Sequence, residues 1–207
     1  MGRFGPDPQT FFKAVYAAAA PWEIGAPQSA MISLIERYPP ASPALDLGCA
    51  SGDLAIHLAL LGCEVHGVDF VERAIEQAHS KLTALPPDVA NRLTFSVADA
   101  MRPSALGTTF SSIFDSGFLH LLDERESEVL VEELGNALRV GGRYYLHAFA
   151  VEFPIDNVPR AVTETELRER FNESTGWRIL HVSDAEFTST IAQATSAIIA
   201  CIERIGK

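Results

Sequence analysis

The chain has 207 residues, 47% of them hydrophobic and 21% charged, a balance typical of a globular protein with one hydrophobic core. Its formal net charge of −11 disfavours polyanionic partners, so we expect neither nucleic acid nor a membrane among its ligands. The apolar stretch 14–20 is too short for a signal peptide or a membrane span, which predicts a cytoplasmic protein.

Strand and helix signals alternate along most of the chain. Residues 1–38 look helical, and the proline-rich segment 39–43 separates them from the first strand. Short apolar runs predict strands at 44–48, 64–68, 93–97, 112–114, 143–149, 177–187 and 196–203. Helical apolar spacing predicts helices at 53–61, 71–85, 124–140 and 163–172. Gly141 and Gly142 are expected to end the helix at 124–140.

This alternation predicts an α/β fold with a doubly wound, seven-stranded, mostly parallel sheet. The last two strands follow each other without a helix, so we expect them to form an antiparallel hairpin at one edge. We expect residues 1–207 to form a single domain, in which residues 1–38 make a helical cap over the active site.

Four successive strands carry an aspartate at or near their carboxyl ends. These residues are Asp46, Asp69, Asp99 and Asp115. Ligands of open parallel sheets bind outside the carboxyl ends of the strands, so the four side chains are expected to border one site. No cysteine or histidine spacing indicates a metal site.

The turn after the first strand indicates the kind of ligand. Gly48 and Gly52 allow a tight turn and a close approach of the ligand to the backbone. Asp69 follows Gly48 by the spacing at which an acidic residue reaches ribose hydroxyls. The run Gly-Cys-Ala-Ser-Gly lacks the glycines of a dinucleotide site, and the acidic side chains of Asp46 and Asp53 favour a cationic ligand. S-adenosylmethionine (SAM) carries both an ammonium and a sulfonium and therefore suits the site better than a dinucleotide.

In the same motifs the chain resembles the class I SAM-dependent methyltransferases. The segment ALDLGCASG at 44–52 is similar to their first motif, and VHGVD at 65–69 is similar to their second strand and ribose-binding acid. The segments ADA at 98–100 and LRVGGR at 138–143 resemble the adenine segment and the turn before the fifth strand. Ala50 departs from the pattern, because the family usually has glycine there. The resemblance covers residues 43–150.

A narrower resemblance covers nearly the whole chain. PWEIGAPQ at 21–28 and DSGFLH at 115–120 are similar to segments of small bacterial methyltransferases related to the thiopurine and thiol/halide enzymes and to mycobacterial heterocycle N-methyltransferases. This resemblance implies that the N-terminal segment folds over the methionine end of SAM. It also implies S-adenosylhomocysteine as product and a small-molecule methyl acceptor.

The two resemblances together imply the cofactor site. Asp99 is expected to accept a hydrogen bond from the adenine amino group, with Ala100 and Met101 lining the ring. The expected cofactor-binding residues are Trp22, Gln28, Asp46, Gly48, Cys49, Gly52, Asp69, Phe70, Asp99, Ala100, Met101 and Asp115.

The acceptor chemistry stays open at the level of the sequence. A phenol or alcohol acceptor needs a general base, for which His120 is the first candidate and His147 the second, whereas a thiolate or an aromatic nitrogen needs none. Asp115 is expected to act as a catalytic polar group near the sulfonium. An apolar acceptor pocket is expected from five aromatic residues: Phe11, Phe12, Phe118, Phe149 and Phe153.

Three functions fit these features. The first is methylation of nitrogen, sulfur or oxygen on an aromatic or heterocyclic small molecule. The second is a thiol or halide methyltransferase, and the third is a SAM-binding pericyclase or other non-methylating protein. Both a monomer and a homodimer agree with the sequence.

Overall fold

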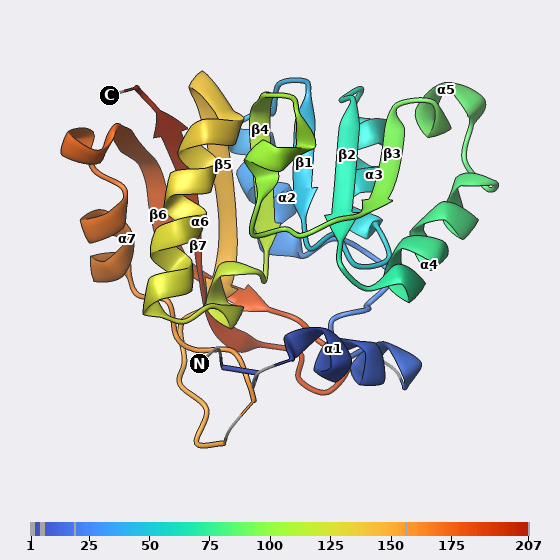
Figure 1. Ribbon diagram of the computed structural model, residues 1–207, viewed down its shortest axis with the longest axis horizontal. Coiled ribbons are helices and arrows are strands. Elements are labelled where there is room, and N and C mark those ends of the chain that lie inside the picture. Colours follow the sequence, from blue (N-terminus) through green and yellow to red (C-terminus); the bar gives the residue numbers. More distant parts are fainter. Residues whose placement is uncertain (1–2, 5–6, 19, 156, 207) are drawn as a thin grey trace.

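The computed structural model describes residues 3–4, 7–18, 20–155 and 157–206, and it contains a seven-stranded sheet with helices on both faces (Figure 1). The strands are β1 (Ala44–Leu47), β2 (Val65–Asp69), β3 (Leu93–Val97), β4 (Phe110–Ser116), β5 (Leu138–Phe149), β6 (Trp177–Phe187) and β7 (Thr195–Arg204). The α-helices are α1 (Pro8–Ala17), α2 (Ser29–Arg37), α3 (Asp53–Leu60), α4 (Glu72–Leu82), α5 (Pro87–Ala90), α6 (Glu124–Ala137) and α7 (Glu164–Arg170). Short 3₁₀ turns are η1 (Pro103–Leu106), η2 (Leu119–Leu121) and η3 (Glu173–Thr175).

The strand order is β3-β2-β1-β4-β5-β7-β6. The neighbouring pairs from β3 to β5 are parallel, and β7 is antiparallel to both β5 and β6. The predicted doubly wound, mostly parallel sheet with an antiparallel edge hairpin is therefore confirmed. Strand order reverses between β1 and β4, and the carboxyl ends of these two strands form the switch point at which such sheets bind ligands.

Alternate side chains of the central strands pack into two hydrophobic layers. Leu45 and Ile113 belong to the layer covered by α6 and α7, whereas Ala44 and Phe114 belong to the layer covered by α2, α3 and α4. Both faces of the sheet are thus buried, which explains why these strands read as nearly continuous apolar runs.

One boundary differs clearly from the sequence prediction. The helix expected at 124–140 ends at Ala137, and β5 begins at Leu138, which pairs with Phe110 of β4. Gly141 and Gly142 lie inside the strand instead of ending the helix. Gly141 adopts a φ of 81° where the β4–β5 register shifts, so the two glycines accommodate an irregularity in the ladder. Pairing with a neighbouring strand outweighs the helical apolar spacing of this segment.

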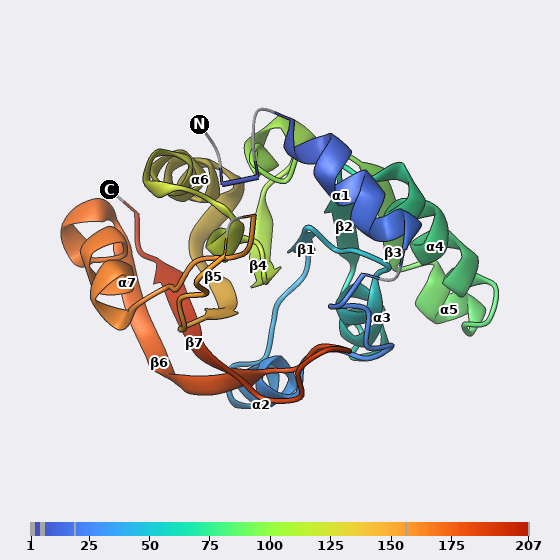
Figure 2. The ribbon, with the colours of Figure 1, turned by 90° about the horizontal axis from the view of Figure 1, so that it is seen from below.

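Seen from the carboxyl ends of the strands, three segments surround the ends of β1 and β4 (Figure 2). They are α1, the loop between β5 and α7, and the tip of the β6–β7 hairpin. Over the described residues no helix has the length and apolarity needed to cross a membrane.

Candidate functional site

The turn between β1 and α3 is held in shape by left-handed backbone conformations. Gly48, Ala50 and Gly52 have φ values of 60°, 51° and 81°. Ala50, which stands where the family usually has glycine, keeps the left-handed conformation at a steric cost of about 1–2 kcal/mol. Its N–H donates to the Asp69 carboxylate at 3.1 Å, and the Val71 N–H donates to the same carboxylate at 2.8 Å. Asp69 therefore fixes two loops at the carboxyl edge.

Asp46 of β1 is a buried carboxylate with one free oxygen. Its side chain is 2% exposed, and its Oδ2 has no hydrogen-bond partner. Burial, aided by the charges of Asp115 and Asp69, raises the pKa of Asp46 to about 8 against a backbone hydrogen bond with Ala55. Asp46 also lines a cavity at the carboxyl ends of the strands. A buried carboxylate in a cavity wall with one unpartnered oxygen is suited to a cationic ligand.

Both oxygens of the Asp115 carboxylate accept hydrogen bonds from groups within the protein. It accepts hydrogen bonds from the N–H groups of Phe118 and Leu119, at 2.7 and 3.0 Å, and from the Tyr144 hydroxyl at 2.6 Å. Burial raises the pKa of Asp115 to about 6 in spite of these bonds. Asp115 is 0% exposed and is not among the residues that line the cavity. It instead fixes the turn that carries Phe118 and η2.

The segment 21–28 is attached to both sides of the site. Glu23 accepts hydrogen bonds from the Ser51 N–H, at 3.0 Å, and from the Ser51 hydroxyl, so it binds the segment to the turn after β1. At the other end, the Gln28 amide donates to the Thr188 carbonyl at 2.8 Å and accepts from the Thr188 N–H at 2.9 Å. Gln28 thus forms a two-bond link to the β6–β7 hairpin. Its amide is committed to that link, although the residue lines the cavity.

Aromatic rings of the N-terminal region pack over the same edge. The Trp22 indole N–H donates to the Tyr16 hydroxyl at 2.9 Å, and the Phe12 ring packs edge-on against Phe70 with centroids 5.7 Å apart. The Arg3 side chain donates to the Val158 carbonyl at 3.1 Å, which ties the start of the chain to the β5–α7 loop.

Asp53, expected from the sequence to favour a cationic ligand, already has a cation beside it. The Lys81 ammonium of α4 lies 2.6 Å from the Asp53 carboxylate and donates to the Ser51 hydroxyl at 2.6 Å. Asp53 is consequently neutralised by the protein, and Asp46 remains the carboxylate with a free oxygen.

A wall of stacked rings lies on the other side of the cavity. The His120 ring stacks on Phe149 with centroids 4.7 Å apart and an interplanar angle of 8°, and Phe187 packs against both. The Phe149 N–H donates to His120 Nδ1 at 3.0 Å. Burial, together with the charges of His147 and Arg160, lowers the pKa of His120 to about 3 against a backbone hydrogen bond with Gly117. The imidazole is therefore neutral at physiological pH, and the bond from Phe149 assigns its proton to Nε2.

His147, the second candidate base, lies deeper in the protein. It is 0% exposed, neither ring nitrogen has a hydrogen-bond partner, and its ring stacks on Phe187 at 4.7 Å. Burial lowers its pKa to about 4. His147 does not line the cavity, so it supports the ring wall from behind.

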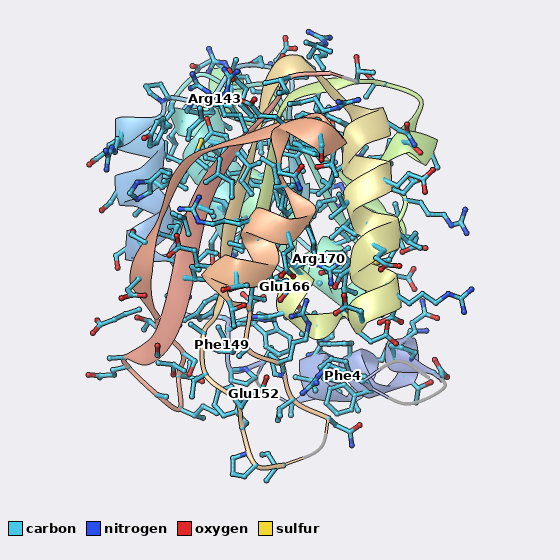
Figure 3. The ribbon with its side chains drawn as sticks, turned by 90° about the vertical axis from the view of Figure 1, so that its left-hand side faces the viewer. Phe4, Arg143, Phe149, Glu152, Glu166 and Arg170 are labelled. Carbon is cyan, nitrogen blue, oxygen red and sulfur yellow. The ribbon has the colours of Figure 1, made fainter. Side chains whose placement is uncertain are left out.

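Arg160 anchors this wall and was not singled out from the sequence. Its guanidinium donates to the Leu122 carbonyl, at 2.7 Å, and forms two bonds of 2.6 and 2.7 Å to Glu166. Its backbone N–H donates to the His120 carbonyl at 2.8 Å. Glu166 also pairs with Arg170, and Figure 3 shows this pair above Phe149 and Phe4, which both line the cavity.

The cavity has a volume of about 430 Å³ and combines these parts. All five aromatic residues expected in the acceptor pocket line it. Of the other expected site residues, those that line it are Trp22, Gln28, Asp46, Gly48, Cys49, Asp69, Phe70 and His120. Those that do not are Gly52, Asp99, Ala100, Met101 and Asp115. Glu23, Ser51 and Phe187 also line it and were not among the site residues expected from the sequence.

Comparison with known proteins identifies the family. A family model described as a methyltransferase domain matches residues 44–142. The 2-heptyl-1-hydroxyquinolin-4(1H)-one methyltransferase of Mycobacteroides abscessus is 32% identical over 171 residues, which are 82% of this chain and 73% of the relative. The chain belongs to the class I SAM-dependent methyltransferases of the small-molecule group. It is therefore a methyltransferase whose cofactor is SAM.

Solved structures agree with this assignment. A structure concerned with the conversion of a disulfide bond into a thioacetal group during echinomycin biosynthesis has a TM-score of 0.79 and 26% identity, covering 95% of this chain and 91% of the other. The 1,6-didemethyltoxoflavin-N1-methyltransferase of Burkholderia thailandensis, with 18% identity and coverage of 95% and 87%, shares the fold at a TM-score of 0.73.

The segment expected to hold adenine in this methyltransferase lies outside the cavity lining. Asp99 is exposed, and its carboxylate accepts the Met101 N–H at 2.9 Å, while Ala100 is 1% exposed within the core. Phe70, at the end of β2, lines the cavity beside Asp69 and offers an aromatic face there. Within the described residues, no group of three or more histidine, cysteine, aspartate or glutamate side chains is placed to hold a metal ion.

Arg160→Ala is expected to lower the free energy of unfolding by about 3 kcal/mol, because it leaves Glu166 half-buried with fewer partners and removes the tie to η2. Chemical denaturation monitored by circular dichroism measures this change. Arg178→Ala, which removes pairs of an exposed arginine with Glu173 and Glu203, is the matched control and should cost less than about 1 kcal/mol. Equal losses of unfolding free energy in the two variants would contradict the role of Arg160 as an anchor of the wall.

Proposed function

We propose that this methyltransferase transfers the methyl group of SAM to a nitrogen, sulfur or oxygen atom of a small aromatic or heteroaromatic acceptor. One observation carries the proposal: a single cavity joins a buried carboxylate with a free oxygen, on Asp46, to a wall of stacked rings around His120 and Phe149. The carboxylate suits the cationic methyl donor, and the flat rings suit an aromatic acceptor.

The residues of the donor side fit SAM. We assign Asp46 Oδ2, which has no partner, to the cationic part of the cofactor. We assign Asp69, which lines the cavity and accepts one backbone N–H at each oxygen, to the ribose hydroxyls through its remaining lone pairs. Gly48 and Ala50 bring the backbone of the turn to the cavity without bulk. Bound SAM supplies a methyl group that its sulfonium already activates for transfer.

The protein's own contribution is mainly positioning and exclusion of water. The described residues between 7 and 28 act as a cap, since Glu23 holds the turn after β1, Gln28 holds the hairpin and Trp22 packs over the edge. This cap is shorter than the segment 1–38 expected from the sequence, because α2 packs on one face of the sheet. We assign Trp22 and Phe70 to the cofactor side of this cap. Gln28 holds the cap closed through Thr188, and Asp115 positions Phe118 through backbone hydrogen bonds.

His120 acts as a hydrogen-bond donor in this proposal, in place of the general base expected from the sequence. Its Nδ1 accepts from the Phe149 N–H, so Nε2–H is the one donor of the ring. It is shared between the Gly117 backbone and the acceptor, which it orients through a lone pair other than the one that attacks the methyl group. A neutral ring with a pKa of about 3 binds a proton too weakly to serve as an effective base near neutral pH. The reacting atom of the acceptor therefore arrives with its lone pair free, as in an aromatic nitrogen, a thiolate or an ionised hydroxyl.

The relatives support a heterocyclic acceptor. The M. abscessus relative is named for a hydroxyquinolinone, and the B. thailandensis structure for an N-methylation of didemethyltoxoflavin. A sulfur acceptor is the second candidate, favoured by the structural neighbour of 26% identity whose chemistry forms a thioacetal.

Incubation with isotopically labelled SAM and a panel of thiols, phenols and N-heterocycles is expected to give a methylated product and one equivalent of S-adenosylhomocysteine, read by mass spectrometry.

The binding of SAM tests the assignment of Asp69. Asp69→Ala should weaken SAM binding, measured by calorimetry, roughly 5- to 150-fold, equivalent to about 1–3 kcal/mol. Asp69→Asn, which keeps one acceptor oxygen for the turn, guards against simple misfolding, and Asp88→Ala on the surface is the control. Failure to bind SAM, or wild-type binding by Asp69→Ala, would refute the cofactor site.

The pH dependence tests the role of His120. With saturating SAM and an acceptor that does not titrate, kcat should stay level from pH 5 to 8, because His120 remains neutral throughout this range. His120→Ala should reduce kcat/KM for the acceptor about 2- to 12-fold, the effect of one lost hydrogen bond. A rise in wild-type kcat near pH 6.5 that disappears in His120→Ala would instead restore the general base. Unchanged turnover in His120→Ala would remove His120 from the reaction.

Binding of the cation should also release a proton from Asp46. The free carboxyl has a raised pKa of about 8 and is mostly protonated at pH 6.5, whereas a bound cation favours its ionised form. Affinity for SAM should therefore rise between pH 6 and 8, and calorimetry at pH 6.5 in buffers of different ionisation enthalpy should show release of close to one proton. Asp46→Asn should abolish the release. Equal proton release by Asp46→Asn and wild type would assign the titration to another group.

A further inference from the structure

Ser116, the last residue of β4, lies where the two sides of the cavity meet. The strand order places β4 between β1, which carries Asp46, and β5, which carries Phe149. Ser116 is partly exposed and lines the cavity. Its hydroxyl is therefore positioned between the buried carboxylate and the ring wall.

His147 of β5 is the neighbour of Ser116 across the sheet. The two residues are register partners in the parallel β4–β5 pair. Two positions earlier in both strands the partners are Phe114 and Tyr145, whose rings stack with centroids 4.4 Å apart. Side chains alternate between the two faces of a sheet, so Ser116 and His147 project from the same face as that stacked pair. Neighbouring strands lie about 4.8 Å apart, a separation that a serine and a histidine side chain can bridge.

The imidazole of His147 is a buried polar group without a hydrogen bond. The residue is 0% exposed, and neither ring nitrogen finds a partner among the described residues. Leaving such a group unpaired in the interior costs free energy, and an apolar side chain would avoid this cost. Packing behind the ring wall therefore does not by itself account for a histidine at this position.

The surroundings of His147 indicate which part of its ring is left for Ser116. Burial lowers the pKa of His147 to about 4, so the ring is neutral at physiological pH and has one N–H and one nitrogen lone pair. The backbone of Glu186 in β6 opposes this shift, as a carbonyl does when it faces the N–H. The lone pair of the other nitrogen is then left for the Ser116 hydroxyl. A serine that donates its proton to His147 keeps its oxygen lone pairs for a ligand in the cavity.

We propose that the Ser116 hydroxyl, oriented by His147, accepts a hydrogen bond from the methyl acceptor, so that the preferred acceptors are heteroaromatic compounds with a donor group, such as an amino group, next to the ring nitrogen that is methylated. This inference rests on the proposed function and names its substrate class. The bond between Ser116 and His147 is not formed in the structure, and rotation of the serine about χ1 forms it.

The hydrogen bond to Ser116 leaves the transfer step to the ring nitrogen of the acceptor. The nitrogen lone pair forms the new N–C bond, while the bond between the methyl carbon and sulfur breaks with its electrons on sulfur. The cationic N-methyl product loses an amino proton to water after release. Ser116 contacts the substrate in this account, whereas His147 is a positioning residue that acts through Ser116.

The test compares 2-aminoquinoline with 2-methylquinoline, which has a similar shape and no donor group. Their dissociation constants are measured by calorimetry with the full chain and S-adenosylhomocysteine, at a pH where both compounds are uncharged. Wild type is expected to bind the amino compound about 2- to 12-fold more tightly, the effect of one hydrogen bond. Ser116→Ala should bind the two compounds equally, and Ser116→Thr, which keeps the hydroxyl, should retain the preference.

A double-mutant cycle tests the role of His147. His147→Leu should remove the same preference as Ser116→Ala, and the double variant should lose nothing more. The unfolding free energy of His147→Leu should stay close to that of wild type, because leucine removes two unpartnered nitrogens. His147→Gln, whose amide oxygen can accept the serine proton, should retain the preference and gives the readout if the leucine variant does not fold. Ser183→Ala is the matched control, since Ser183 contacts His181 at 3.1 Å outside the cavity, and it should keep the full preference.

Equal wild-type affinity for the two compounds, failure of both to bind, or an unchanged preference in Ser116→Ala would overturn the inference. Loss of the preference in Ser116→Ala but not in His147→Leu would also overturn it, because the serine would then act without the histidine. Methylation of the acceptor panel with no effect of Ser116→Ala would refute the Ser116 site and leave the proposed function intact. A preference that depends on Ser116, without methyl transfer to any acceptor, would refute the proposed function itself.

Discussion

The form of the site depends on three buried carboxylates at one edge of the parallel sheet and on the groups that compensate their charge. Asp69, Asp46 and Asp115 belong to the adjacent strands β2, β1 and β4. Burial is the largest factor that raises the pKa of each one. Asp69 and Asp115 are compensated by backbone N–H groups of the loops that follow, and these bonds give the loops their shape. Asp46 keeps one oxygen without a partner.

The rest of the site follows from that arrangement. A buried carboxylate with a free oxygen is costly unless a cation or a proton reaches it, so the edge is prepared for a positively charged ligand. Lys81 does not fill this role, because it is held by Asp53 and Ser51. Glu23 and Gln28 attach the segment 21–28 to both sides of this edge. In the proposed function this segment limits the access of water, and the aromatic wall binds the acceptor beside the donor.

The strands and the sheet type could be predicted from the sequence because their signals are local and repeated. Apolar strand segments, helical apolar spacing and glycine turns all indicated the same alternation, and the family motifs indicated the order of the strands. The end of α6 escaped prediction, since Leu138 leaves the helix only to pair with Phe110, a contact that no local pattern encodes. Asp46 and Asp69 were predicted because motif and strand end coincide, and both line the cavity.

The hydrogen-bond and ion-pair partners of the site residues could not be predicted, because they come from segments distant in the sequence. Asp53 pairs with a lysine of the next helix, the Gln28 amide is taken up by a backbone 160 residues away, and His120 receives its hydrogen bond from the N–H of Phe149. None of these partners follows from spacing. Asp99, Ala100 and Met101 follow β3 as expected, but they are not among the residues that line the cavity, and the Asp99 carboxylate accepts the Met101 N–H.

The most direct test of the role assigned to Asp46 is a crystal structure of the protein with bound S-adenosylhomocysteine. The ligand's amino nitrogen is predicted to lie on the side of the cavity where Asp46 Oδ2 is free, within about 4 Å of that oxygen, with the ribose hydroxyls at Asp69. Ligand bound outside this cavity, or bound inside it with the Asp46 oxygen still lacking a partner, would contradict the role assigned to the buried carboxylate.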